Sequence, residues 1–480
     1  MNYRMVARIA SMVLIIFAAL MLLPIIVALC YGESVRGFAV ALVITAAAGA
    51  LLFFACKPRT RAIYSREGFA AVSAAWLLMG LFGAIPFSVS GDIPSYFNAV
   101  FETVSGLTTT GASVVADVEV MSRSGLFWRS FLEWVGGMGV LIFIMAVLPM
   151  GGEHSMHIMR AEVPGPTVGK FVPRAGDTAR ILYVIYAALT LIETLLLMLG
   201  GMTPYDALLH AFATAGTGGF STYNAGIAAF NSAYIEMVIA VFLLLFGINF
   251  NLYYLLLIGR VKNALKSEEL HWYLGIIAVA TVSIALGLVH RYGSIITALR
   301  YAFFNSVSLM STAAFFTVHT TDWPQYTRII LVFLMCIGGC AGSTGGGLKV
   351  SRVLLLFKTA AVDIRRVLHP REVRRVQLDS HRVDESTTKA VYCFFWLYFV
   401  IILATTFVVS FDGYDFATCL TAALSCMSNV GPNLSLAGVG TSYLMFSPFT
   451  RLVMMAVMLL GRLEIYPLLI LLAPSVWKKK

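Results

Sequence analysis

The amino-acid sequence predicts an all-α membrane protein: four similar units surround one pore, and two extra transmembrane helices precede them. Three observations predict it. The chain has 480 residues, of which 59% are hydrophobic and only 12% charged, whereas soluble domains are about 45–50% apolar and about 25% charged. Long apolar stretches recur along the chain, each near the roughly 20 residues that a membrane span needs. Between them, four shorter apolar segments end in similar strings of small and hydroxyl residues.

The long apolar stretches are interpreted as ten membrane spans. The formal net charge is +10, and most of the 34 Lys and Arg fall in segments on the side that would carry both termini. Cytoplasmic loops are enriched in Lys and Arg, so this side is predicted to be cytoplasmic. The basic charge then reflects topology in a lipid bilayer and not binding of nucleic acid. The spans lie near residues 5–31, 38–56, 69–87, 126–150, 181–201, 234–258, 270–290, 326–357, 391–411 and 448–472.

The spans divide the chain into segments of similar design. Each repeat is expected to contain a span, a short re-entrant helix, a polar loop and a second span. The equivalent loop positions recur at intervals of roughly 100 residues. We expect two N-terminal helices at 1–57, repeats at 68–150, 178–260, 269–359 and 389–474, and a basic cytoplasmic linker at 360–388.

The four loops are the candidate ion-binding site. Non-helical backbone at membrane depth is tolerated only where it lines water or packs within protein. Four such loops around one axis would present rings of carbonyl oxygens, which can replace the hydration shell of a monovalent cation. The alternative is four ordinary polar outer loops, in which Gly, Ser and Thr are also common. The predicted filter residues are Thr109, Thr110, Gly111, Gly218, Gly219, Ala313, Ala314, Asn429, Val430 and Gly431.

A glycine-rich segment at 338–347 interrupts the eighth span and is a candidate gate beneath the loops. Gly costs about 1 kcal/mol relative to Ala within a helix, so a regular helix is not expected here. A phosphate-binding loop is excluded, because Leu348 separates the last glycine from Lys349 and no strand precedes the segment. The alternative is close helix packing at the glycines. The gate residues are Gly338, Gly339, Gly342, Ser343, Thr344, Gly345, Gly346 and Gly347.

Arg462 lies within the last span and is the charged residue assigned to the pathway. An ionisable group at this depth is costly and therefore a functional candidate. Its guanidinium can donate to loop carbonyls, and its charge would repel a permeating cation. The alternative is a structural pair with Glu464. The basic residues of the 360–388 linker are either ordinary cytoplasmic charge or a docking surface for an acidic partner or anionic lipid.

Four strings of the sequence are distinctive: VSGLTTTGA at 104–112, GGFST at 218–222, GGCAGSTGGGLK at 338–349 and GRLEIYP at 461–467. They resemble the TrkH/TrkG family of bacterial potassium-uptake proteins, within the superfamily that includes the Ktr and HKT transporters, and the resemblance covers nearly the whole chain. It implies K⁺ uptake across the bacterial inner membrane, with K⁺ held at the filter residues and 338–347 as an intramembrane gate loop. It also implies a homodimer, a cytoplasmic TrkA-type partner that alone binds nucleotide, and no covalent cofactor.

One position departs from the family pattern. The family usually has glycine nine residues before a Trp-Pro pair, and counting back from Trp323 gives Ala314. A methyl group is costly there if the residue has positive φ, so we expect a slightly altered filter with weaker rejection of Na⁺. Whether Gly218 or Gly219 is the second filter glycine stays open. The alternatives are a Na⁺ or poorly selective cation pathway on the same fold and, in another class, a polytopic membrane enzyme.

Overall fold

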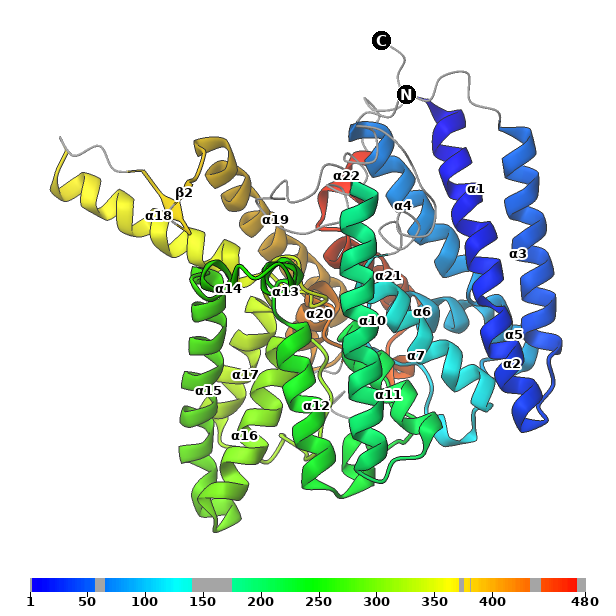
Figure 1. The fold of residues 1–480 in the computed structure, drawn as a ribbon, viewed down its shortest axis with the longest axis horizontal. Helices are drawn as coiled ribbons and strands as arrows, with labels where there is room; N and C mark the ends of the chain where they lie inside the picture. The colour runs from blue at the N-terminus through cyan, green and yellow to red at the C-terminus, as the bar shows by residue number, and fades with distance from the viewer. Residues whose placement is uncertain are drawn as a thin grey trace.

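The computed structural model describes residues 2–56, 65–139, 175–370, 375–379, 381–431 and 442–472, and these residues form a bundle of helices (Figure 1). The described chain departs from the all-α prediction at one point. Strands β1 (Gln377–Leu378) and β2 (His381–Arg382) pair antiparallel beside the outer part of α18 (Val350–Leu368). This two-residue ladder lies on the projecting arm and not in the bundle.

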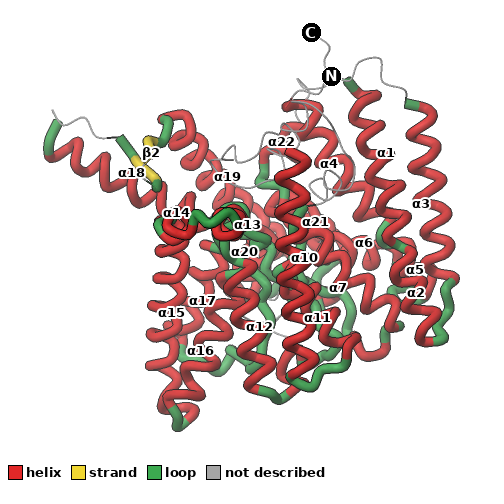
Figure 2. The backbone as a smooth tube through the Cα atoms, viewed as in Figure 1, coloured by secondary structure: helices red, strands yellow, loops and turns green. Residues whose placement is uncertain are grey.

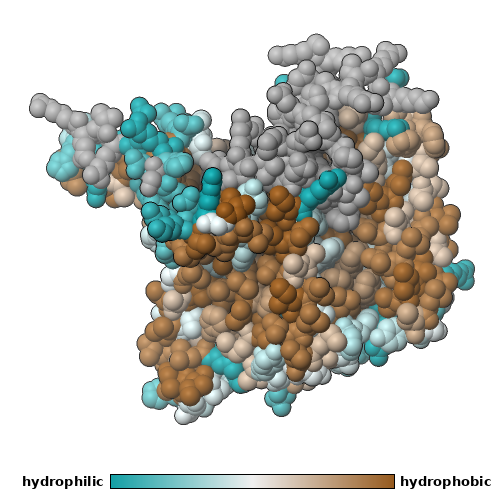
Figure 3. Space-filling model, viewed as in Figure 1, coloured by the Kyte–Doolittle hydropathy of each residue, from teal (hydrophilic) through white to brown (hydrophobic). Residues whose placement is uncertain are grey.

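Six helical stretches among the described residues are long and apolar enough to cross a membrane, or seven if one bent pair counts as a span. The first is nearly continuous from α1 to α2, and the third joins α4 to α5. Many of their side chains are exposed and apolar, such as Leu51 and Leu199. Figure 3 shows a broad apolar belt across this face of the molecule. The helices are α1 (Tyr3–Leu20), α2 (Leu22–Tyr31), α3 (Arg36–Ala55), α4 (Ser65–Phe82), α5 (Ile85–Ser90), α10 (Ala175–Leu199), α15 (Glu268–Tyr292) and α19 (Glu385–Val409).

The expected spans at 234–258 and 448–472 are not single straight helices. Helices α12 (Ala233–Phe246) and α13 (Phe250–Leu257) meet at 88°. Asn249 causes the new start, since its side chain accepts from the amide of Asn251 and caps α13. Helices α21 (Pro448–Arg462) and α22 (Tyr466–Leu472) are separated by a short turn in which Glu464 and Ile465 have positive φ.

The expected spans at 126–150 and 326–357 also differ from simple helices. Helix α7 (Arg123–Gly137) begins the former, and residues 140–150 lie outside the described part of the chain. The latter is α17 (Gln325–Ile337), an irregular segment, and then α18, so the predicted interruption is present. Helix α18 runs on to Leu368, past the expected repeat boundary at 359. Of the linker cations, Arg371 and Arg374 lie outside the described residues, as do Arg160, Lys170 and Lys478–Lys480.

The interior of the bundle holds short helices and loops. Figure 2 shows loop segments running through the middle, near α20 and α7. The interior helices are α6 (Tyr96–Leu107), α11 (Pro204–Gly216), α16 (Ile295–Met310) and α20 (Phe416–Ser428). The two N-terminal spans pack on one side of this centre: the ring of Phe17 lies 5.3 Å from that of Trp128 on α7. Helix α14 (Val261–Leu265) and 3₁₀ turns at Val118–Val120, Gly226–Phe230, Ser410–Asp412 and Tyr443–Met445 complete the described structure.

Candidate cation-coordinating site

Each of the four interior helices α6, α11, α16 and α20 starts at a polar residue and ends in the bundle. Thr203 caps α11 by accepting from the amide of Asp206, and Pro204 occupies the first turn. Asp415 caps α20 by accepting from Thr418. The last turn of each helix is buried. A helix end carries a partial negative charge, so all four helices bring that charge to the interior loops.

All four helices end in the same backbone motif. The residue after the helix, or the next one, is left-handed: Thr109, Thr217, Thr312 or Asn429, each with φ between 53° and 69°. The following amide then donates back to the carbonyl five residues earlier, as in a Schellman ending. These bonds join Thr110 to Ser105 (2.8 Å), Gly218 to Ala213 (2.9 Å), Ala313 to Ser308 (3.0 Å) and Val430 to Ser425 (2.9 Å).

A second left-handed residue follows two positions later in every loop. These residues are Gly111, Gly219, Ala314 and Gly431, with φ values of 75°, 88°, 50° and 96°. Gly218 is not among the residues with positive φ, so Gly219 is the geometric counterpart of Gly111. Ala314 therefore holds a conformation that favours glycine, which is the condition under which its methyl group is costly.

The backbones of successive loops are in close contact. A Cβ built on Gly111 would lie 1.9 Å from the carbonyl oxygen of Gly218, and one on Gly219 would lie 1.9 Å from that of Ala313. A Cβ on Gly431 would lie 2.3 Å from the carbonyl oxygen of Thr110. These distances are far too short for a side chain. The first loop thus contacts the second, the second contacts the third, and the fourth contacts the first, with backbone oxygens at each junction.

Buried charges hold the first two loops from behind. Arg129 on α7 forms an ion pair with Glu102 on α6, with Nη2 2.7 Å from Oε1, and both side chains are at most 2% exposed. Glu102 also accepts from the Ser113 hydroxyl (2.9 Å) and the Val114 amide (2.8 Å).

One turn further along α7, Glu133 accepts from the Phe220 amide at 3.2 and 3.3 Å. Residues four apart share a helix face, so α7 supports both loops at once.

Hydroxyl groups hold the last two loops. The Ser308 hydroxyl donates to the Phe315 carbonyl at 2.8 Å. The Tyr443 and Ser425 hydroxyls both donate to the Gly431 carbonyl at 2.5 Å. The Asn429 amide reaches across to the Thr110 hydroxyl at 3.0 Å and so joins the fourth loop to the first. Pro432 and Asn433, which follow, lie outside the described residues.

The glycine-rich segment 338–347 lies directly against the ends of α16 and α20. The amide of Gly346 donates to the Thr312 hydroxyl at 2.7 Å. A Cβ on Gly346 would lie 2.1 Å from the Ser428 carbonyl oxygen, and one on Gly345 would lie 2.7 Å from that of Ser311. Glycine is required here by the close approach of two backbones. The segment also bonds to the α12–α13 break, where the Cys340 amide donates to the Gly247 carbonyl at 2.9 Å.

Arg462 connects this segment to the opposite side of the site. Its Nη1 donates to the Thr344 carbonyl at 2.7 Å, and its Nη2 donates to the Gly136 and Gly137 carbonyls at 2.6 Å. The alternative considered above was a pair between Arg462 and Glu464. Glu464 instead pairs with Arg352 on α18, with 2.6 Å between Nη2 and Oε2. The reason is the backbone turn at Glu464, which directs its side chain away from the end of α21.

Sequence reasoning missed Glu269, Lys349 and the Glu102–Arg129 pair. Glu269 on α15 accepts from the amides of Ala341 (2.6 Å) and Ser351 (3.1 Å) and so joins the glycine-rich segment to the first turn of α18. No local motif marks Glu269 or the Glu102–Arg129 pair, because each acts on a partner more than twenty positions away. Lys349 instead bonds to the Gly345 carbonyl, four positions back. A buried charge in an apolar stretch is the signal that sequence offers.

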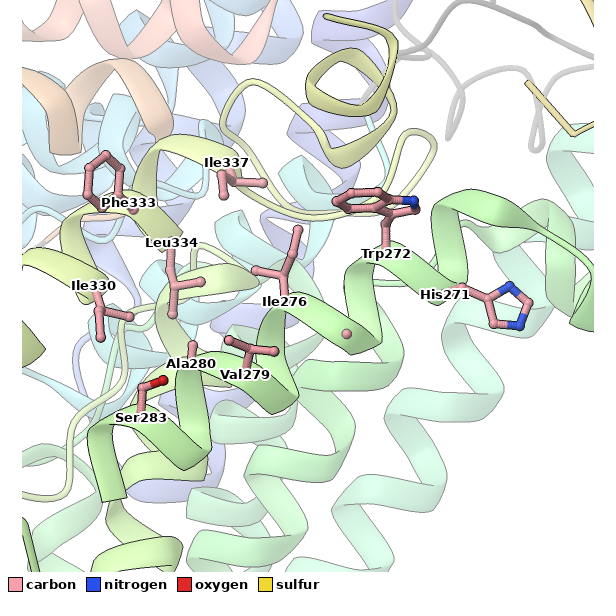
Figure 4. Close-up of a pocket in the computed structure, with 11 residues that line it drawn as sticks. His271, Trp272, Ile276, Val279, Ala280, Ser283, Ile330, Phe333, Leu334 and Ile337 are labelled. Carbon is pink, nitrogen blue, oxygen red and sulfur yellow. The ribbon is translucent and has the colours of Figure 1, made fainter. Parts of the chain in front are cut away.

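A separate groove of about 600 Å³ opens between α15 and α17 (Figure 4). Its lining is apolar, including Ile276, Val279 and Phe333, with His271 near one end and the Ser283 hydroxyl among the few polar groups. A cation needs several oxygen ligands, so this groove does not suit one. The four loops remain the site where oxygens converge.

Multi-span helices around inward-facing loops define a membrane transport protein, and comparisons with known proteins agree. The model of the TrkH family, described as "Cation transport protein", matches residues 35–479. The chain is 36% identical over 486 residues to the Trk system potassium uptake protein TrkH of Salmonella typhimurium, with 100% of both chains covered. It is 32% identical to the TrkG protein of Escherichia coli, covering 99% of each.

The structure of the potassium transporter TrkH from Vibrio parahaemolyticus superposes with a TM-score of 0.90 at 34% identity, covering 100% of both chains. The chain therefore belongs to the TrkH family of cation transport proteins. It is a multi-pass membrane transporter and not an enzyme.

Proposed function

We propose that this protein takes up K⁺ across the bacterial inner membrane through a channel-like pore. The backbone oxygens of the four loops form the selectivity filter, with Thr109–Gly111, Gly218–Gly219, Ala313–Ala314 and Asn429–Gly431 as its four sides. Carbonyl rings of this kind replace the water shell of a monovalent cation. The observation that carries the proposal is the shared ending of the four helices, with paired left-handed residues and the same backward hydrogen bond. The relatives named as potassium transporters support it.

We further propose that 338–347 is the gate, with Arg462 as its charged latch. The segment packs against the inner ends of α16 and α20, and Arg462 bonds it to α7 across the site. Ions passing the loops would meet this segment and a fixed positive charge. The arm formed by α18, β1 and β2, at the end of the bundle where α1 begins (Figure 1), is then cytoplasmic. It is the proposed contact for a nucleotide-binding TrkA-type subunit, and the protein works as a homodimer with both termini inside.

The test is cation uptake by the purified protein in lipid vesicles. K⁺ or Rb⁺ influx above that of empty vesicles is expected, and shortening the chain at Gly345–Gly347 should raise it. Absence of cation influx into vesicles, together with failure to restore low-K⁺ growth in a strain that lacks its own K⁺ uptake systems, would refute the uptake proposal. Unchanged influx in the shortened variant would refute the gate.

A less selective pathway, passing Na⁺ as well as K⁺, is the second candidate function. Ala314 favours it. Three junctions of the ring leave no space for a Cβ atom, yet the third loop carries a methyl group at the equivalent position. We infer that the junction between the third and fourth loops is wider than the other three. K⁺ and Na⁺ permeabilities measured in the same vesicles separate the two candidates.

A further inference from the structure

Two neighbouring carbonyls of the glycine-rich segment each accept from a cationic side chain. Arg462 donates to the Thr344 carbonyl at 2.7 Å, and the ammonium of Lys349 donates to the Gly345 carbonyl. Arg462 arrives from α21, whereas Lys349 follows the segment directly and caps the start of α18. Its side chain therefore turns back over the loop that it terminates. Gly345 in turn lies against the Ser311 carbonyl at the inner end of α16.

Lys349 is buried, and its own backbone conformation is strained. Its side chain is part of a residue that is 3% exposed, and its backbone has φ of 76°. A non-glycine residue rarely adopts that region, and such strain concentrates at functional sites. Its amide donates to the Ile337 carbonyl at 2.8 Å, which closes the base of the loop. Glycine would satisfy this backbone without strain, so the lysine side chain needs another reason.

The carboxylates near Lys349 have other partners, and its side chain bonds to a backbone oxygen instead. The neighbouring charged groups are Arg462, Arg352, Glu269 and Glu464. Glu464 is already paired with Arg352, and Glu269 already accepts from two backbone amides. Within the described residues no carboxylate forms an ion pair with Lys349. The Lys349 side chain therefore meets a backbone oxygen that a partly dehydrated cation would also bind.

We propose that Lys349 is a tethered competitor for the permeating ion: its ammonium occupies the Gly345 carbonyl in this closed arrangement and must leave it when ions pass. An ammonium group is a compact monovalent cation that donates to the same carbonyl oxygens that bind K⁺. Arg462 bonds the segment to α7 on the opposite side of the site. Lys349 occupies a carbonyl oxygen of the segment itself. The proposal rests on the proposed role of 338–347 as a gate.

The first experiment compares basal Rb⁺ influx into vesicles, without any regulatory partner, for Lys349→Met and the native protein. Removal of a charge-assisted hydrogen bond is expected to raise influx about tenfold. The matched control is Lys389→Met, which removes an exposed lysine that pairs with Glu385 on α19, outside both the glycine-rich segment and the α18 arm. It should leave influx at the native level. A shortened 345–347 variant is measured alongside.

The second experiment restores the charge chemically. Lys349→Cys, in a background with the native cysteines replaced, should be as leaky as Lys349→Met. Aminoethyl methanethiosulfonate adds an amine of nearly lysine length and should lower influx again, whereas methyl methanethiosulfonate should not. Equal effects of both reagents would overturn the proposal, since packing alone would then explain Lys349. If the shortened variant leaks and Lys349→Met does not, the lysine inference fails and the gate stands. If neither leaks, the gate itself fails.

Discussion

The two halves of the loop ring are held in different ways. Behind the first two loops lie the buried ion pair of Arg129 on α7 with Glu102, and the buried carboxyl group of Glu133 on the same helix. Behind the last two lie neutral hydroxyls from separate elements, such as Ser308 and Tyr443. The glycine-rich segment contacts the ends of α16 and α20, which belong to the second half.

This difference suggests a division of labour. A buried ion pair is costly to break, because each partner is left as an uncompensated charge. The first half is therefore expected to act as a fixed wall. Neutral hydrogen bonds contribute about 1 kcal/mol each, so the second half can adjust when the segment beneath it moves. The ring junction that carries Ala314 also falls in this half.

The largest effect is expected for Arg129→Met, which leaves Glu102 buried and unpaired. The loss should be about 3–5 kcal/mol of stability, read as a large drop in the thermal unfolding midpoint in detergent. The control is Arg291→Met, whose pair with Asp322 is 46% and 65% exposed. Exposed pairs contribute at most about 1 kcal/mol, so this variant should melt near the native protein. Similar melting of both variants would contradict the fixed-wall interpretation.

Gly111→Ala should abolish K⁺ flux and destabilise the chain by about 1–3 kcal/mol through overpacking. The added methyl would lie 1.9 Å from the Gly218 carbonyl oxygen. Gly91→Ala tests strain alone, because Gly91 also has positive φ (88°) but nothing lies within 4 Å of its Cβ position. Flux is measured in vesicles for both. Retained flux in Gly111→Ala would show that the first two loops do not meet as described.

Tyr443→Phe should alter the K⁺/Na⁺ permeability ratio about twofold to fivefold, since it removes one of two hydroxyls on the Gly431 carbonyl and costs about 1 kcal/mol. Tyr414→Phe is the control. It removes a hydroxyl bond to the Met445 carbonyl (2.8 Å) without touching the loops and should leave the ratio unchanged. A stronger effect than that of Arg129→Met on folding would reverse the proposed order of the two halves.

The smallest effect is expected for Ala314→Gly. Glycine removes about 1 kcal/mol of strain from the left-handed backbone of the folded state. It also raises the conformational entropy of the unfolded chain, which offsets a similar free energy, so stability should hardly change. The K⁺/Na⁺ permeability ratio should rise a few-fold as the ring becomes uniform. Ala313→Gly, at a position without positive φ, should not raise it. Equal ratios in the native protein and Ala314→Gly would remove Ala314 as the cause of weaker selectivity.

Much of the site was predictable because it repeats. The four short helices and their loops appear in sequence as similar strings, and the glycines mark positions of positive φ or close backbone approach. The interruption at 338–347 was predictable from its glycines. The break between α12 and α13 was not, since Gly247 and Asn249 are ordinary in an apolar stretch. A bend there is stabilised by bonds to the glycine-rich segment, roughly 90 residues away.

By itself the sequence determined the multi-span membrane fold, and it predicted the fourfold repeat and the role of the loop residues. These follow from hydropathy, length and local backbone preference, which act over a few residues. Tertiary structure alone decided which charges meet: Arg129 with Glu102, Glu464 with Arg352, and Arg462 with carbonyls of α7 and the glycine-rich segment. The physical reason is that a buried charge must find a partner wherever the fold brings one, and that partner leaves no mark nearby in the sequence.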